Sequence, residues 1–309
     1  MTPLSLTALV HEGPIARAYL SMLHAEGYRL DRIVLMVAKR DLAHGTPVAP
    51  WLPTQLRRRV ARVVQDLRMN HWPREFLRTH GNSLRPWLQE MASAYQFDPA
   101  AYSSLTERPD YARYADQVDE VLTDGLADPS LSSHLLGLAR PSTILFTGGG
   151  MVPESLLSIP QCRFIHVHPG VLPNVRGADG LLWSLILRGR PGATAFYMSP
   201  GLDAGDIILS SDLDVPPAPI GLENFDATMA YRLLYAFVDP MLRAVLLRRV
   251  IDQARTQGRD DLFDLPTVAQ HEYEGTTFNF MNKRLRTFAF DRWQALASAR
   301  VSARPVQDS

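Results

Sequence analysis

Two histidines and an aspartate, His166, His168 and Asp203, lie near one another in the middle of the chain. Imidazole and carboxylate side chains are the usual groups for proton transfer near neutral pH. Two histidines and one carboxylate are also a recognised set of metal ligands. The sequence therefore directs attention to the elements that would bring these three side chains together.

Residues 163–168 alternate around apolar side chains and stop at Pro169, which predicts a strand that runs into a loop. Side chains two residues apart in a strand point to the same face, so both imidazoles are expected on one side of the sheet. After a second predicted strand, residues 193–199, Gly201 and Gly205 allow a tight turn around the aspartate between them. We expect the three side chains to meet at one sheet edge.

The surrounding sequence predicts an α/β fold. Short β-prone runs occur at residues 4–10, 32–38, 143–146, 163–168 and 193–199. The opening order of strand, turn, helix and strand predicts a Rossmann-like, mostly parallel sheet flanked by helices. Ligands bind such sheets beyond the carboxyl ends of the strands, where the strand order reverses. The glycines at 148–150 and both histidines lie at the carboxyl ends of predicted strands.

Long helical patterns interrupt and follow the predicted sheet. Residues 54–139 show only helical spacing, for example at Val118, Val121 and Leu122. We therefore expect one domain over residues 1–215 with a helical insertion at about 45–140. Residues 216–309 are expected to form a mainly helical C-terminal extension, with a bend or break at Pro240.

Composition excludes several classes of protein. The 309 residues carry equal numbers of acidic and basic side chains, so neither nucleic acid nor a membrane surface is expected as the main partner. Cys162 is the only cysteine, so internal disulfides are excluded. We expect its side chain to pack in the core. The start of the chain does not resemble a signal peptide, and no stretch is expected to span a membrane. We expect a cytoplasmic protein.

The central region resembles the 10-formyltetrahydrofolate-dependent formyltransferases, which include glycinamide ribonucleotide, methionyl-tRNA and amino-sugar formyltransferases. The resemblance covers roughly residues 142–215, with a weaker similarity at 4–38. It rests on three runs in the expected order: His-Val-His-Pro-Gly-Val-Leu-Pro from His166, Arg-Gly-Ala from Arg176, and Gly-Leu-Asp-Ala-Gly-Asp-Ile-Ile from Gly201.

The family pattern is an asparagine, one further residue and a histidine, followed by a distant aspartate. By this resemblance His168 and Asp203 take the places of the family histidine and aspartate, which manage proton transfer. His166 stands where the family has the asparagine whose amide donates to the developing oxyanion. A histidine can also donate through a ring N–H, so we expect His166 to serve as a catalytic residue in place of the amide.

The resemblance also implies 10-formyltetrahydrofolate as the co-substrate. Its pocket is expected at two loops of this chain, formed by Gly150, Met151 and Val152, and by Gly201, Leu202 and Ala204. The acceptor is expected to be an amine of a small molecule, such as an amino sugar or an amino-acid derivative. Methionyl-tRNA is disfavoured because the chain is neutral and residues after 215 look helical. A phosphate acceptor at the first turn is disfavoured by Glu12.

Three alternatives remain open at this point. The same folate could be hydrolysed by water, the two histidines and Asp203 could bind a metal, or the protein could bind folate without turnover. We favour formyl transfer with no metal. The inserted helices and the C-terminal extension are candidates for an acceptor pocket or for a homodimer interface.

Overall fold

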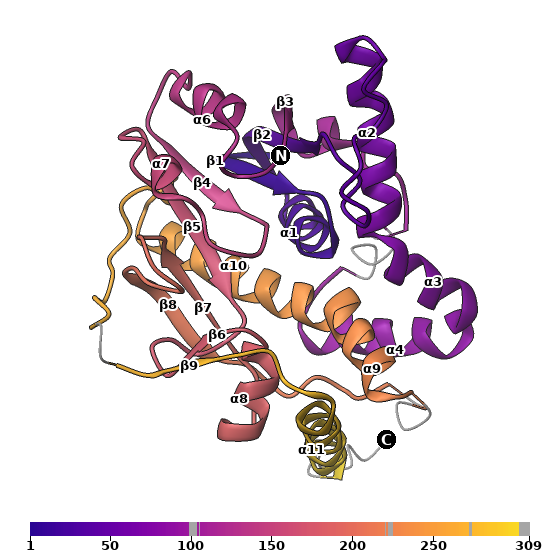
Figure 1. The fold of residues 1–309 in the computed structure, drawn as a ribbon. Coiled ribbons are helices and arrows are strands. Elements are labelled where there is room, and N and C mark those ends of the chain that lie inside the picture. The colour runs from indigo at the N-terminus through magenta and orange to yellow at the C-terminus, as the bar shows by residue number, and fades with distance from the viewer. Residues whose placement is uncertain (99–103, 105, 220, 222–224, 272–273, 303–309) are drawn as a thin grey trace.

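The centre of the molecule is a seven-stranded sheet with strand order β3-β2-β1-β4-β5-β7-β8 (Figure 1). We describe it from a computed structural model that covers residues 1–302 except 99–103, 105, 220, 222–224 and 272–273. The strands are β1 (Thr2–His11), β2 (Tyr28–Ala38), β3 (Ala115–Thr123), β4 (Ser142–Phe146), β5 (Cys162–His168), β7 (Gly192–Tyr197) and β8 (Ile207–Asp212). The first five strands in this order, β3, β2, β1, β4 and β5, run parallel to one another. Strand β7 pairs in the antiparallel direction with both β5 and β8. The predicted α/β fold with a mostly parallel sheet is confirmed.

Helices cover both faces of the sheet. Helices α1 (Pro14–Ala25) and α10 (Asp239–Thr256) pack together on one face, above the larger core. The short helices α6 (Pro129–Leu136) and α7 (Glu154–Leu157) cover the other face, where Cys162 is buried. Burial on both faces explains why the parallel strands read as nearly continuous apolar runs. The strand order reverses between β1 and β4, so a ligand site is expected beyond their carboxyl ends.

The expected helical insertion is only partly helical. It contains α2 (Thr54–Met69), α3 (His71–Thr79), α4 (Gly81–Ala94) and the short η1 (Tyr111–Arg113). The expectation of helix was wrong at residues 115–123, which form edge strand β3 and pair in parallel with β2. Val118, Val121 and Leu122 have helical spacing, but the charged residues between them form ion pairs with side chains of neighbouring elements. Asp119, for example, forms an ion pair with Arg32 of β2.

The C-terminal part is mainly helical, as predicted. It contains α9 (Ala227–Leu233), the π-helical segment η3 (Leu234–Val238), α10 and α11 (Lys283–Ser302), together with strand β9 (Thr276–Phe278). The helical run continues from α9 to α10 but changes to the π-helical form in η3, just before Pro240, the second residue of α10. A π-helical turn is a local irregularity of the kind expected next to a proline, which lacks the N–H that a regular helix requires. Helix α10 belongs to the main core; the domain boundary at residue 215 stays a prediction.

Two smaller elements close the region after β5. Strand β6 (Val175–Gly177) pairs in parallel with β9, and helix α8 (Gly180–Arg188) follows at once. Helix α8 ends at Gly189, which adopts the left-handed conformation that glycine allows at the end of a helix. No helix in the described part of the chain is long and apolar enough to cross a membrane.

Candidate functional site

Strand β5 ends in the two histidines, and the turn between β7 and β8 brings Asp203 to them. The Nδ1 atom of His168 lies 3.5 Å from Oδ1 of Asp203. The aspartate has a left-handed backbone, with φ of 49°, and its Oδ2 accepts a hydrogen bond of 2.7 Å from the N–H of Gly177. Both histidines line the same cavity, so the predicted meeting of the three side chains at this sheet edge is confirmed.

The tautomer of His168 follows from its second contact. Its Nε2 lies 2.8 Å from the carbonyl oxygen of Val175, which can only accept, so Nε2 carries the hydrogen. In the neutral ring Nδ1 is then a lone pair beside the Asp203 carboxylate. Burial lowers the pKa of His168 below 6.5, and the neighbouring carboxylate partly opposes this shift. Nδ1 is therefore a ready proton acceptor, and Asp203 stabilises the imidazolium that forms.

His166 is held differently. Its Nδ1 lies 3.2 Å from the carbonyl oxygen of Phe146, and its ring packs against the rings of Phe146 and Phe196. Burial, with Arg243 as a second cause, lowers the pKa of His166 to about 3, so the ring is neutral near physiological pH. From the sequence we expected His166 to present a ring N–H to the cavity. The structure contradicts this, because the Nδ1 hydrogen is directed to Phe146.

Arg243 of helix α10 is a site residue that the sequence analysis missed. The side chain is buried; its Nη1 donates to the carbonyl oxygen of Val167 at 2.7 Å and lies 3.4 Å from Nε2 of His166. Its Nε donates to Oδ2 of Asp239 at 2.8 Å, one helical turn earlier. A charged pair inside the otherwise apolar first half of α10 is a signal that could have identified these residues.

A cavity of about 740 Å³ opens in front of these groups. Gly150, Met151, Gly201 and Leu202, four of the six residues expected to hold the co-substrate, line it. The two others do not: Val152 is buried in the core beneath α7, and Ala204 lines an adjoining cavity of about 600 Å³ that also reaches Gly201 and Leu202.

The large cavity combines accessible backbone with apolar side chains. No atom lies within 4 Å of a Cβ built at Gly149 or Gly150, so their backbone is open to a ligand. Met151 and Leu202 expose apolar side chains beside it. An apolar cavity bordered by accessible backbone is a common form of small-molecule site.

Asp179 forms the opposite wall and was also missed. Its Oδ1 accepts hydrogen bonds of 2.6 and 2.8 Å from the hydroxyls of Tyr231 and Tyr235, and its Oδ2 accepts one of 2.7 Å from the N–H of Met281. All but Met281 line the cavity. The buried carboxylate thus ties three segments that are distant in sequence around the cavity, a relationship that the sequence alone does not show.

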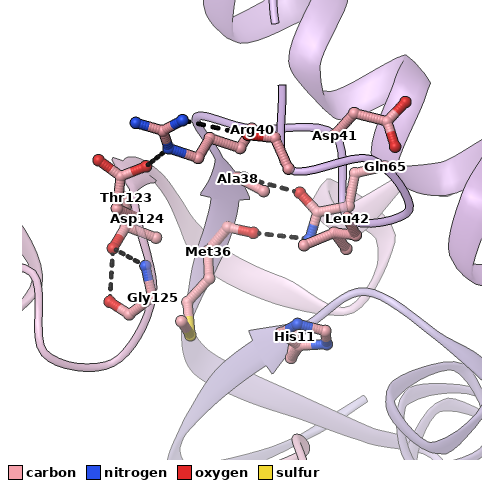
Figure 2. A pocket seen from close by; sticks show the side chains of 11 residues that line it. His11, Met36, Ala38, Arg40, Asp41, Leu42, Gln65, Thr123, Asp124 and Gly125 are labelled. Atoms are coloured by element: carbon pink, nitrogen blue, oxygen red, sulfur yellow. Dashed lines mark hydrogen bonds and ion pairs between the residues drawn. The ribbon is translucent and has the colours of Figure 1, made fainter. Parts of the chain in front are cut away.

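A smaller cavity of about 260 Å³ lies at the carboxyl ends of β1, β2 and β3 (Figure 2). Its charged side chains are engaged by the protein. Arg40 lies 3.4 Å from Asp124, and Asp41 accepts a hydrogen bond of 3.0 Å from Arg68. Gln65 bonds to the backbone of β2 through both its amide atoms. We assign the chemistry to the larger cavity.

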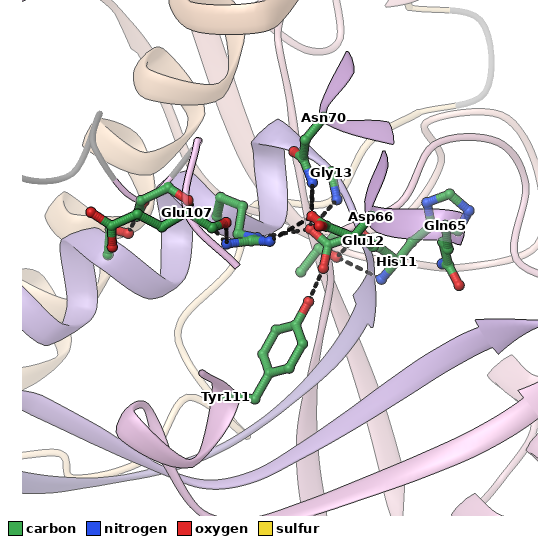
Figure 3. A network of polar contacts seen from close by, with 12 residues as sticks. His11, Glu12, Gly13, Gln65, Asp66, Asn70, Glu107 and Tyr111 are labelled. Carbon is green, nitrogen blue, oxygen red and sulfur yellow. Dashed lines mark hydrogen bonds and ion pairs between the residues drawn. The ribbon is translucent and has the colours of Figure 1, made fainter. Parts of the chain in front are cut away.

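Glu12 is part of a buried polar network at the start of α1 (Figure 3). Its Oε1 accepts hydrogen bonds from Nε of Arg17 at 2.8 Å, from the N–H of Gly13 at 3.1 Å and from Nδ2 of Asn70 at 2.9 Å. The hydroxyl of Tyr111 donates to the other carboxylate oxygen. The first turn after β1 is therefore filled by the protein's own carboxylate, which argues against a phosphate site there.

Metal binding has little support at the histidine pair. No group of three or more histidine, cysteine, aspartate or glutamate residues is arranged to hold a metal ion within the described chain. The guanidinium of Arg243 also lies beside the lone pair of His166, and its positive charge opposes a cation at that nitrogen.

Comparison with known proteins agrees with the geometry. The formyl transferase family matches residues 123–221, which include both histidines and Asp203. The methionyl-tRNA formyltransferase of Syntrophus aciditrophicus (strain SB) is 33% identical over 157 residues, 50% of this chain and 49% of that protein. Residues 123–221 are therefore similar to the formyl transferase family. The methionyl-tRNA formyltransferase of Alkaliphilus oremlandii (strain OhILAs) is 28% identical over 162 residues.

The chain spans about half the length of these curated relatives, 49% and 46%. Among solved structures, a sugar N-formyltransferase from Shewanella sp FDAARGOS_354 aligns with 93% of this chain and 87% of its own at 11% identity, with a TM-score of 0.42. The formyltransferase PseJ from Anoxybacillus kamchatkensis aligns with 57% of this chain and 83% of its own at 19% identity, with a TM-score of 0.36.

Proposed function

We propose that this protein is an N-formyltransferase that moves a formyl group from 10-formyltetrahydrofolate to an amine of a small metabolite. The observation that carries the proposal is the contact between His168 Nδ1 and Asp203 Oδ1, 3.5 Å apart in the wall of the large cavity. Both residues lie within the stretch that matches the formyl transferase family.

10-Formyltetrahydrofolate supplies an activated formyl group. In the transfer, the amine nitrogen forms a bond to the formyl carbon, the bond from that carbon to N10 breaks, and the proton lost by the amine ends on N10. His168 is suited to carry that proton, because its Nδ1 lone pair lies beside Asp203 in the wall of the cavity. The carboxylate of Asp203 stabilises the positive charge of the imidazolium while His168 carries the proton. Such proton transfer contributes about a hundred- to ten-thousand-fold in rate.

The two loops that line the cavity support binding of the folate. Gly150 and Met151 on one side, and Gly201 and Leu202 on the other, would hold the ring between open backbone and apolar side chains. Val152 and Ala204 would act only by shaping these loops, since neither lines the main cavity. Loss of tetrahydrofolate binding in Leu202→Arg, measured by calorimetry, is the expected result.

The acceptor side of the cavity supports a small amine. Trp72, Tyr231, Tyr235 and Phe280 give it aromatic walls, and Arg232 stacks on Trp72 at 3.8 Å. The C-terminal part that closes this side is mainly helical. This setting favours an amino sugar or an amino-acid derivative as the acceptor.

The direct test is incubation of the purified protein with 10-formyltetrahydrofolate and a panel of amino sugars and amino acids, followed by mass analysis. A formylated amine supports the proposal; formate alone would favour hydrolysis of the folate; binding without turnover would favour a non-catalytic folate-binding protein. We expect His168→Ala to lower turnover at least about a hundred-fold. His44, an exposed histidine in another part of the chain, provides the matched control His44→Ala.

A further inference from the structure

The two nitrogens of His166 leave no N–H group for the formyl oxygen. The Nδ1 atom lies 3.2 Å from the carbonyl oxygen of Phe146, and since a carbonyl only accepts, the single hydrogen of the neutral ring is on Nδ1. Nε2 is then a lone pair. The pKa of about 3, which follows from burial and the nearby charge of Arg243, keeps the ring neutral where enzymes usually work.

Arg243 has the donors that His166 lacks. A guanidinium carries five N–H groups. One is directed at Asp239, and two on Nη1 face the carbonyl oxygen of Val167 and the Nε2 lone pair of His166. The hydroxyl of the buried Tyr19 is a further hydrogen-bonding neighbour of the guanidinium, which leaves one N–H group for a ligand. Arg243 lines the cavity together with both histidines, so a buried positive charge stands beside the reacting site.

We propose that Arg243 is the catalytic residue that donates to the formyl oxygen, and that His166 is a positioning residue that accepts an N–H of Arg243 and holds the guanidinium in place. This inference rests on the formyl transfer proposed above. The negative charge that develops on the formyl oxygen when the amine attacks would be met by a fixed cation instead of an amide.

The surroundings fix the guanidinium before any substrate binds. Asp239 is fully buried, and its Oδ2 lies 2.8 Å from Nε of Arg243. The carbonyl oxygen of Val167, between the two histidines on β5, holds Nη1 at 2.7 Å. Donors that are already oriented in a water-poor site stabilise developing charge without reorganisation. Hydrogen bonds from a charged donor are also stronger than those from a neutral amide.

The first test compares Arg243→Met with Arg249→Met. Arg249 is on the same helix but at its outer side, where it bonds to Ser211 at 3.0 Å, and serves as the control. Using an amine that the wild type formylates, we expect Arg243→Met to lower kcat about a hundred- to a thousand-fold while tetrahydrofolate still binds. Added guanidinium ion, at concentrations too low to denature, should restore part of the rate. Turnover within about threefold of wild type would overturn the proposal and leave the formyl transfer intact.

A second pair of variants tests the role of His166. His166→Asn keeps an oxygen that can accept an N–H from Arg243, whereas His166→Ala does not. We expect His166→Asn to retain more activity than His166→Ala, and both to retain more than Arg243→Met. A larger loss in His166→Ala than in Arg243→Met would contradict the assignment.

A measurement on the unmodified protein covers the case in which Arg243→Met does not fold or no amine is turned over. Nitrogen-15 chemical shifts of the histidine rings distinguish the tautomers. We expect neutral His166 to carry its hydrogen on Nδ1. A hydrogen on Nε2, facing the cavity, would restore His166 as the donor and overturn the proposal. Absence of any formylated amine from the wild type would instead argue against the proposed function.

Discussion

The Nε2 atom of His168 donates to the carbonyl oxygen of Val175 at 2.8 Å, which turns the other ring nitrogen toward Asp203. Residue 175 begins strand β6, so the short loop after β5 returns to fix the tautomer of the histidine at its end. The segment from β5 to β6 therefore supplies both the imidazole of His168 and the carbonyl oxygen that fixes the direction of its lone pair.

This orientation predicts a specific pH dependence. His168 must be neutral to accept a proton, so kcat/KM should fall as the pH drops through its pKa. Burial lowers that pKa below 6.5, and the acidic limb should lie below this value. Asp203 raises the pKa of His168, so Asp203→Asn should move the limb to still lower pH while lowering the plateau at least about a hundred-fold. A limb that moves to higher pH in Asp203→Asn would contradict this arrangement.

Gly170 gives a steric test of the same contact. A Cβ at this position would lie 2.7 Å from Nε2 of His168 and 2.8 Å from the carbonyl oxygen of Val175. Gly170→Ala should break their hydrogen bond and lower kcat by about a hundred-fold, with a loss of about 1–3 kcal/mol in stability.

Gly81→Ala is the matched control for Gly170→Ala, because its Cβ would meet only the Nε of Arg85 at 3.6 Å, an ordinary contact. Steady-state kinetics and urea unfolding of both variants give the comparison. Equal activity in the two variants would show that the hydrogen bond between His168 and Val175 is not needed for turnover.

The sequence predicted the parts of the fold that are set by local pattern. The apolar strands and the irregular helix just before Pro240 each follow from residues close in the chain. Strand β3 was missed because an edge strand needs little apolar surface, and its charged residues find partners on β2. Propensity and spacing do not contain that information.

The site divides in the same way. His168 and Asp203 were identified because glycine and proline frame them in one short segment. Arg243 was missed because helix α10 crosses back over β5 only in the folded chain, 77 residues beyond His166. The tautomer of His166 depends on a carbonyl oxygen of β4, 20 residues before it. Long-range contacts of this kind decide which nitrogen can donate.

The buried His166 should also make the protein sensitive to acid. Its pKa is about 3 in the folded protein and about 6.5 in an unfolded chain, so the unfolded state binds the extra proton between these values. Stability from this group is complete above pH 6.5 and is lost as the pH falls toward 3, by up to about 1.4 kcal/mol per pH unit.

His166→Asn removes this titration, so its free energy of unfolding should depend less on pH over that range. Urea unfolding at several pH values, with wild type in parallel, measures the difference. Parallel curves for the two proteins would mean that His166 is already protonated in the folded state or that its pKa is not depressed.

The network around Glu12 should be a matter of stability. Arg17 is almost fully buried and lies 2.8 Å from Glu12 and 3.0 Å from Asp66, so its charge depends on both carboxylates. Glu12→Gln keeps the shape but removes one of the two balancing charges. We expect a loss of about 3 kcal/mol, the lower end of the usual cost of breaking a buried ion pair, since Asp66 remains. Glu75→Gln, which breaks an exposed pair with Arg78, is the control and should change stability much less, because solvent screens that pair. Urea unfolding measures both losses, and equal values would show that the buried pair contributes no more than a surface one.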